Sequence, residues 1–141
     1  MAFSCIAIGL DQLGKVNLQH GWMTGNRMLQ ESVKSLLSLK QEEEELYRLD
    51  GANFALLGPI ASDVAGFRAT ELRRCLAQSN VQVDNYQLPL ISSVGVVSVE
   101  SRRRDSTTKA ADAICEALLQ MLYRAKDQGG NTVEIHSSKH F

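Results

Sequence analysis

Residues 46–57 read Leu-Tyr-Arg-Leu-Asp-Gly-Ala-Asn-Phe-Ala-Leu-Leu, two apolar runs on either side of Asp50-Gly51. An Asp-Gly pair between apolar runs is the strongest short-range signal for a β-hairpin, because these residues readily adopt the positive φ angles of a tight turn. Gly58-Pro59 follows and ends the second run, as this dipeptide marks a turn. We therefore predict two antiparallel strands joined at Asp50-Gly51.

Apolar spacing on both sides of the hairpin predicts alternating strands and helices. We expect a buried strand over residues 3–10 and a helix over about residues 25–40. After the hairpin, Ser62 can cap a helix, and Pro89 demotes the first part of a strand over residues 86–99 to an edge or bulge. A last helix is expected from a cap at Thr107 or Thr108 to Gly129-Gly130, followed by a strand over residues 131–135. The apolar faces of the two later helices are predicted to be Val64, Phe67, Leu72, Cys75 and Leu76, and Ala111, Ile114, Cys115, Leu118, Leu122 and Ala125.

This order of elements predicts an α/β (α+β) fold with a central mixed, largely antiparallel sheet and helices packed on it. The sequence shows no repeat and no linker, so residues 1–141 are predicted to form a single domain. The acidic run 41–45 is interpreted as a solvated helix end or loop, and 101–105, with three arginines, as a polar connection. The tail 136–141 has no pattern and is expected to be frayed.

Composition excludes several classes of protein. Of the 141 residues, 44% are hydrophobic and 22% charged, which is ordinary for a globular domain and rules out a disordered tail or a coiled coil. No apolar run is long enough to span a membrane. The net charge of −1 disfavours nucleic acid as a partner. The three cysteines are widely separated, which predicts buried free thiols and, with no signal peptide recognisable, a cytoplasmic location.

The hairpin resembles the signature of the GGDEF family, the bacterial diguanylate cyclases, which usually reads Arg-x-Gly-Gly-Asp/Glu-Glu-Phe. Arg48, Gly51 and Phe54 match it, whereas Asp50 replaces the first glycine. Four further stretches resemble family motifs in the same order along the chain. They are residues 6–17, ending Leu-Gly-Lys-Val-Asn, residues 20–29, His-Gly-Trp-Met-Thr-Gly-Asn-Arg-Met-Leu, residues 91–96, Ile-Ser-Ser-Val-Gly-Val, and residues 122–133, Leu-Tyr-Arg-Ala-Lys-Asp-Gln-Gly-Gly-Asn-Thr-Val.

The resemblance implies a fold like the palm of nucleotidyl cyclases and a place in a larger protein. The family's opening helix, Asp-x-Leu-Thr-x-Leu-x-Asn-Arg, has no counterpart before Phe3. We therefore expect the chain to be a fragment of a larger multidomain signalling protein. In such proteins the domain often precedes a phosphodiesterase-type EAL domain, and this chain contains no residues of that kind.

Family resemblance also implies a metal-dependent reaction that this chain lacks the ligands to support. An active cyclase joins two GTP molecules, and divalent metal neutralises the phosphates. The family supplies carboxylate ligands, which hard cations prefer, from the end of the first strand and from the acidic pair of the hairpin. Gly9, Ala52 and Asn53 stand at these positions. We therefore expect no metal site, no cofactor and no catalytic residue. The carboxylate of Asp50 is also expected to repel phosphate.

The nucleotide pocket is partly retained on the same comparison. Asn17 matches the family's guanine-contacting asparagine, and Lys126 matches its phosphate-contacting lysine. Asn26 replaces an aspartate, and Gly130 replaces an arginine. Asn17 and Asn26 can equally serve as caps or turns, and Lys126 can simply favour a helix C-terminus. The family's inhibitory product site, Arg-x-x-Asp, aligns with the acidic residues 41–44, so a cyclic dinucleotide is not expected to bind there.

Three functional hypotheses follow. The first is an inactive GGDEF-like domain with a regulatory or protein-interaction role in cyclic-di-GMP signalling, in contact with a neighbouring domain, a partner protein or a second copy. The second is a sensor that binds GTP weakly, without turnover, and tunes a neighbouring domain. The third is a cyclase with a rebuilt metal site, for which Asp11 and Asp50 are the only candidate carboxylates. None of them requires nucleic acid or direct membrane contact.

Overall fold

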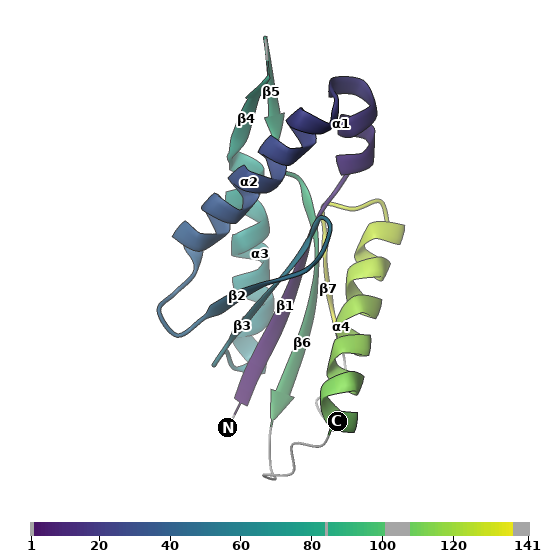
Figure 1. The fold of residues 1–141 in the computed structure, drawn as a ribbon. Helices are drawn as coiled ribbons and strands as arrows, with labels where there is room; N and C mark the ends of the chain where they lie inside the picture. The colour runs from purple at the N-terminus through teal and green to yellow at the C-terminus, as the bar shows by residue number, and fades with distance from the viewer. Residues whose placement is uncertain (1, 84, 101–107, 137–141) are drawn as a thin grey trace.

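A computed structural model describes residues 2–83, 85–100 and 108–136 of the chain (Figure 1). The strands are β1 (Ala2–Leu10), β2 (Glu45–Asp50), β3 (Asn53–Gly58), β4 (Asn80–Val83), β5 (Tyr86–Pro89), β6 (Ser92–Glu100) and β7 (Val133–Ile135). The helices are α1 (Leu13–His20), α2 (Trp22–Leu39), α3 (Ser62–Gln78) and α4 (Thr108–Asp127). The predicted first strand, hairpin and last helix are confirmed.

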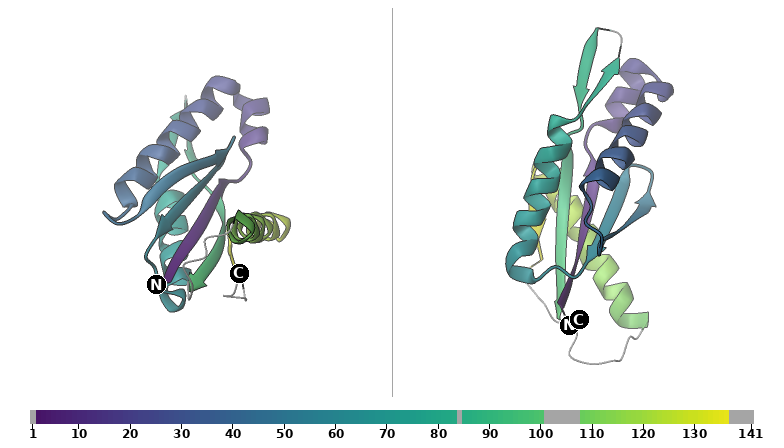
Figure 2. Two further views of the ribbon diagram at one scale, coloured as in Figure 1. Left: turned by 60° about the horizontal axis from the view of Figure 1, so that its bottom comes forward. Right: turned by 90° about the vertical axis from the view of Figure 1, so that its left-hand side faces the viewer.

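A five-stranded sheet in the order β2-β3-β1-β6-β7 forms the centre of the fold. The β1 strand pairs antiparallel with β3 and β6, and only β6 and β7 run parallel. The predicted mixed, largely antiparallel sheet is therefore confirmed. Helices α2 and α3 lie on one face of the sheet and α4 lies on the other, giving three layers (Figure 2). Both faces of β1 are covered, which explains its nearly unbroken apolar sequence.

Alternation along β1 divides the core into two parts. Ile6, Ile8 and Leu10 pack with α2 and α3, together with Phe54 of the hairpin. Ala7 lies in the second cluster, which packs against α4. Side chains at odd positions of β1 thus face α4 and those at even positions face α2 and α3, because successive side chains point to opposite faces of a sheet. Gly9 therefore belongs to the α4 side.

Three elements were absent from the predicted order: α1, β4, and β5 as a strand separate from β6. The segment between residues 10 and 21, which contains two glycines, forms helix α1 after a left-handed residue, Gln12 (φ 64°). Helix α1 has no buried residue. A helix that buries no face needs no strong apolar stripe, and such a stripe is what identifies a helix in sequence. The predicted strand over residues 86–99 is two strands, since β5 turns away after Pro89 to pair with β4 in a separate hairpin. The N–H of Leu90 donates to Ser79 O (3.1 Å) and fixes this break.

Helix α3 packs on a different face from the one predicted. Its buried residues are Ala65, Ala69, Leu72 and Leu76. The side chains of Val64 and Phe67 are exposed, Phe67 by 78%, so their predicted burial is wrong. The N-cap is Ala61 and Ser62 is the first helical residue, with no side-chain cap hydrogen bond. The small alanines permit close packing on the sheet, which a search for large apolar residues overlooks.

The glycines after α4 agree with the sequence-based prediction, whereas one of the three cysteines does not. Gly129 (φ 106°) and Gly130 (φ 77°) follow α4, as expected for glycines that end a helix. Cys115 is exposed, and Cys5 and Cys75 are partly exposed, so the prediction of buried thiols is wrong for Cys115. The predicted connection 101–105, a cap at Thr107 and the tail 137–141 fall outside the described residues. Among the helices described, none is long and apolar enough to cross a membrane.

Candidate functional site

The positions expected to lack metal ligands meet at one end of the sheet. Gly9 pairs with Asn53 of β3 on one side and with Ser93 of β6 on the other. The N–H of Leu10 donates to Ala52 O (3.1 Å), which holds the turn of the hairpin beside the end of β1. The structure thus brings Gly9, Ala52 and Asn53 together, although 42 or more residues of sequence separate Gly9 from the other two.

The tip of the hairpin is held by its own polar groups. Asn53 Nδ2 donates to Asp50 Oδ1 (2.6 Å), and Arg48 Nη2 donates to Gly51 O (2.6 Å). The register shifts between Arg48 and Asp50, as in a β-bulge. Phe54 is buried and anchors the strand that follows. The signature residues therefore form one ordered turn in which the exposed Asp50 is bonded within the turn.

Gly9 leaves a space that two other side chains use. A Cβ built on Gly9 would collide with Asn53 Oδ1 and would lie 3.0 Å from Lys126 Cε and 3.1 Å from Lys126 Nζ. Asn53 Oδ1 is buried and has no hydrogen-bond partner. Any larger residue at position 9 therefore requires Asn53 and Lys126 to move.

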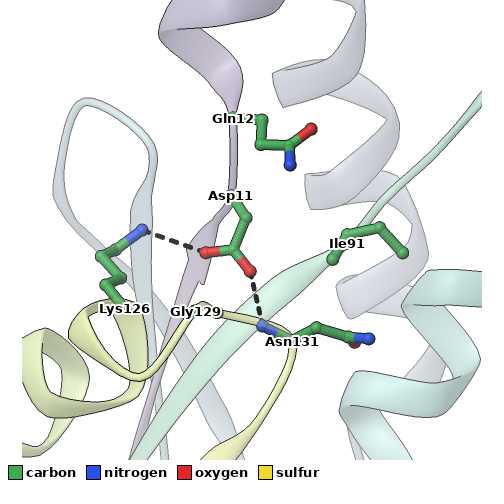
Figure 3. A pocket seen from close by; sticks show the side chains of 7 residues that line it. Asp11, Gln12, Ile91, Lys126, Gly129 and Asn131 are labelled. Atoms are coloured by element: carbon green, nitrogen blue, oxygen red, sulfur yellow. Dashed lines mark hydrogen bonds and ion pairs between the residues drawn. The ribbon is translucent and has the colours of Figure 1, made fainter.

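Asp11, just beyond β1, is the centre of a polar cluster (Figure 3). Ser93 Oγ donates to Asp11 Oδ1 (2.7 Å), and the N–H of Asn131 donates to Asp11 Oδ2 (2.8 Å). Lys126 Nζ lies 3.6 Å from Asp11 Oδ1 and donates to Leu10 O (3.3 Å). The Asp11 side chain is only 11% exposed. Its carboxylate is thus committed to contacts within the chain.

A shallow hollow of about 480 Å³ adjoins this cluster. Its lining residues are Asp11, Gln12, Ile91, Lys126, Gly129, Gly130 and Asn131. The backbone of Gly130 passes so close to Asp11 that an added Cβ would lie 2.6 Å from Asp11 Oδ2. The roles of Ser93 and Asn131 were not anticipated; the left-handed Asn131 (φ 53°) after two glycines is the local signal that could have identified one of them.

The other two nucleotide-binding candidates lie on α1 and α2. Asn17 of α1 packs against Gly25 of α2, where any Cβ would collide with Asn17 Oδ1. Asn17 Oδ1 is buried without a partner, whereas Asn26 is exposed. Neither asparagine lines the hollow that contains Lys126. The structure therefore does not unite Asn17, Asn26 and Lys126 in one described pocket.

The donors at the end of β1 do not fit a divalent cation. Within residues 2–83, 85–100 and 108–136, no three His, Cys, Asp or Glu side chains lie together so that they could hold a metal ion. The nearest carboxylate, Asp11, is engaged as described, and Asn53 offers only a neutral amide oxygen. Magnesium prefers near-octahedral sites with carboxylate oxygens. The residues at the end of β1 therefore do not favour the binding of Mg²⁺.

The acidic run before the hairpin is not wholly solvated. Glu42 and Glu43 are exposed, but the Glu44 side chain is 2% exposed and pairs with Arg68 of α3. Burial raises the pKa of Glu44, but hydrogen bonds from Arg68 and from the N–H of Gln41, with the charges of Arg68 and Lys40, outweigh it and lower the pKa below 4.5. The interpretation of this run as solvated is therefore wrong for Glu44. No local pattern distinguishes it from its neighbours, because its partner is distant in sequence.

Comparison with known proteins gives consistent matches over nearly the whole chain. Residues 1–132 match the family described as "Diguanylate cyclase, GGDEF domain". Diguanylate cyclase DgcP of Pseudomonas aeruginosa is 26% identical over 129 residues, covering 91% of this chain and 18% of that protein. An uncharacterized signaling protein of Caulobacter vibrioides is 31% identical over 131 residues, covering 91% of this chain and 16% of that protein. The chain thus spans less than a fifth of the length of these two relatives.

Solved structures agree with these matches. The active GGEEF domain of a diguanylate cyclase from Vibrio cholerae superposes with a TM-score of 0.78 at 25% identity, covering 99% of this chain and 85% of that one. A sensory box/GGDEF family protein from Caulobacter crescentus superposes with a TM-score of 0.75 at 30% identity, covering 91% and 80%. The resemblance inferred from the hairpin and the four further motifs is confirmed.

Proposed function

Because this chain belongs to the GGDEF family of diguanylate cyclase domains, we propose that it is a catalytically inactive member with a regulatory or protein-interaction role in cyclic-di-GMP signalling. In this role the domain changes the behaviour of a neighbouring domain or partner protein by contact, without synthesising a product. The proposal concerns catalysis and contacts, which the family membership alone leaves open.

The end of β1 carries the proposal. Gly9, Ala52 and Asn53 meet there, and none has a carboxylate to bind a divalent cation or to activate a hydroxyl group. Groups that act as a unit in catalysis contribute non-additively. Loss of such a unit lowers turnover by many powers of ten. The backbone geometry of the hairpin is kept while the chemistry it would serve is missing, which supports a retained scaffold.

The remaining carboxylates support the same proposal. Asp11 accepts from Ser93 and Asn131, and Asp50 accepts from Asn53. A cyclase with a rebuilt metal site would need these two aspartates to converge on one ion. They do not occur together in any metal-competent group among the described residues, so the rebuilt cyclase is the weakest of the three hypotheses.

Exposed apolar side chains support a role in protein contacts. Leu18, Trp22 and Met23, which lie around the junction of α1 and α2, are 90%, 74% and 83% exposed. Large apolar side chains that are this exposed, and this close together in the chain, are more often found at contact sites than dispersed on the surface of a monomer. These three side chains lie on α1 and on the first turn of α2, two helices that follow each other at one end of the molecule (Figure 1).

One observation favours the GTP sensor as a second candidate. Asn17 Oδ1 is buried and unpartnered at the junction of α1 and α2. A buried acceptor without a donor is unfavourable by about 1–3 kcal/mol, and a ligand bearing N–H groups would remove that penalty. The sensor would use this acceptor to bind guanine without turnover.

Calorimetric titration separates the candidates. GTP and then cyclic di-GMP are titrated into the chain with Mg²⁺ present, and the mixture is analysed for product. We expect no heat with either ligand and no product. Saturable GTP binding that Asn17→Ala abolishes, and that Gln30→Ala on the exposed side of α2 leaves unchanged, would establish the sensor instead. Formation of cyclic di-GMP by the unaltered chain would refute the proposal of an inactive domain.

A further inference from the structure

Lys126 of α4 reaches the end of β1, where it lies close to oxygen atoms of Leu10 and Asp11. Its ammonium group donates to Leu10 O at 3.3 Å and lies 3.6 Å from Asp11 Oδ1. The point at which a Cβ of residue 9 would stand is 3.1 Å from Lys126 Nζ, and Asn53 Oδ1 lies closer still to that point. The ammonium therefore contacts a backbone carbonyl and a carboxylate at the end of β1, and it lies beside the space that residue 9 leaves open.

Two of the side chains at this end of the sheet, Asp11 and Asn53, hold oxygen atoms that are largely removed from water. The Asp11 side chain is 11% exposed, so its negative charge is largely removed from water. Asn53 Oδ1 is buried with no hydrogen-bond partner. A lysine ammonium is a compact charge with three donors, and the Lys126 side chain is itself only 30% exposed.

Lys126 can reach this place because of two features of the fold. It stands in the last turn of α4, just before Gly129 and Gly130 turn the chain back toward Asp11. Gly9 has no Cβ, and the space that a side chain there would fill holds the end of Lys126 and the amide of Asn53. The loss of a side chain at position 9 and the position of the lysine are thus complementary.

We infer that the Lys126 ammonium is the resident cation at the end of β1 and occupies the space in which a divalent metal ion would have to be coordinated. It joins α4 to β1 through its hydrogen bond to Leu10 O and its ion pair with Asp11, and it supplies a positive charge there without a metal ion. The inference rests on the proposed function in one respect only, which is that residues 9, 52 and 53 do not coordinate metal in the native chain.

Restoring carboxylates tests whether the ammonium occupies the site. Two variants carry Gly9→Asp and Asn53→Glu, one combined with Lys126→Ala and the other with Lys34→Ala on the exposed side of α2. The two have equal net charge, and only the first lacks the ammonium at the end of β1. Titration with Mg²⁺ is expected to show at least 10-fold tighter binding to the Lys126→Ala variant. Equal affinities in two folded variants, checked by circular dichroism, would overturn the inference.

Measurements that need no restored site provide a second test. The unaltered chain is expected to show no saturable Mg²⁺ binding, and saturable binding would overturn the inference. Lys126→Met is expected to lower Tm by about 2–4 °C relative to Lys34→Met, and Mg²⁺ is expected not to restore it. Equal Tm values for the two variants would also overturn it. A failure of the proposed function can be told apart from a failure of this inference, because only the former would appear as product formed from GTP by the unaltered chain.

Discussion

Replacing Arg68 by methionine is expected to destabilise the domain strongly. Arg68 Nε and Nη2 donate to the two oxygens of Glu44 at 3.0 and 2.5 Å, and Nη2 also donates to Leu39 O at 2.8 Å. The side chains of Arg68 and Glu44 are 10% and 2% exposed. This pair ties α3 to the segment between α2 and β2. Arg68→Met removes the positive charge and leaves the buried carboxylate of Glu44 without its main partner.

The size of the effect follows from that burial. Removing one partner of a buried ion pair costs about 3–5 kcal/mol. We expect about 3 kcal/mol, the lower value, because the N–H of Gln41 still donates to Glu44 (2.7 Å). For a domain of this length the loss corresponds to a fall in Tm of about 10 °C. The double variant Glu44→Leu/Arg68→Met should recover at least half of the loss, since an apolar pair of similar volume avoids the unpaired charge.

Urea unfolding of the four members of this double-mutant cycle, at pH 7, measures the free energies. Arg74→Met, an exposed position on the same helix, is the control and should change stability by less than about 0.5 kcal/mol. A loss below about 1 kcal/mol for Arg68→Met would refute the reasoning. So would a double variant that is less stable than Arg68→Met alone, because the cost would then not come from an unpaired carboxylate.

The same pair predicts a dependence of stability on pH. Although burial alone raises the pKa of Glu44, Arg68, the N–H of Gln41 and the charge of Lys40 lower it below its ordinary 4.5. The folded state therefore binds fewer protons than the unfolded state in this range, and stability rises with pH. The contribution of Glu44 should be fully present above about pH 5 and be lost as the pH falls through the lowered pKa. In the Glu44→Leu/Arg68→Met variant this part of the pH dependence should be absent.

Two further predictions concern packing and thiol reactivity. Gly95→Val should destabilise the domain by about 1–3 kcal/mol or more, because a Cβ there would lie 2.6 Å from the backbone of α4, whereas Gly14→Ala, with nothing within 4 Å, should be neutral or stabilising; equal urea midpoints for the two would contradict this packing. Burial, with a smaller contribution from the nearby Cys115, raises the pKa of Cys5 to about 11. Because burial remains when Cys115 is replaced, Cys75→Ser/Cys115→Ser should react with a disulfide reagent at pH 8 at least about 10-fold more slowly than Cys5→Ser/Cys75→Ser. Comparable rates would show that the Cys5 thiol is not suppressed.

Local sequence was sufficient where an element's pattern arises from residues close together in the chain. The apolar runs on either side of Asp50-Gly51 predicted the hairpin correctly. Its two turn residues are Gly51 and Ala52, one position later than predicted, and neither Asp50 nor Gly51 has a positive φ. The apolar run of β1 and the glycines after α4 likewise identified those elements from local sequence. The family motifs added the order of the elements and the correspondence of Gly9, Ala52 and Asn53 to one end of the sheet. That correspondence is what the register of β1 and β3 confirms.

Local pattern was misleading where burial depends on a distant neighbour. Val64 and Phe67 are apolar but exposed, while Ala65 and Ala69 are buried, because the sheet selects the face of α3 that can approach it most closely. The same argument applies to Cys115, which continues an apolar stripe of α4 but lies on its exposed side. Apolar character predicts that a helix has a buried face and leaves the angular position of that face to the packing partner.

The sequence by itself determined the family, the hairpin and the absence of acidic residues at positions 9, 52 and 53, because residue identity and apolar pattern are local properties. Only the tertiary structure decided that Glu44 is buried against Arg68 and that Lys126 reaches Asp11 and the carbonyl of Leu10. Charges far apart in the chain interact only after folding has removed them from water and brought them within a few ångströms. Whether a charged residue is solvated, paired or placed at a vacated position is therefore a property of the packed molecule.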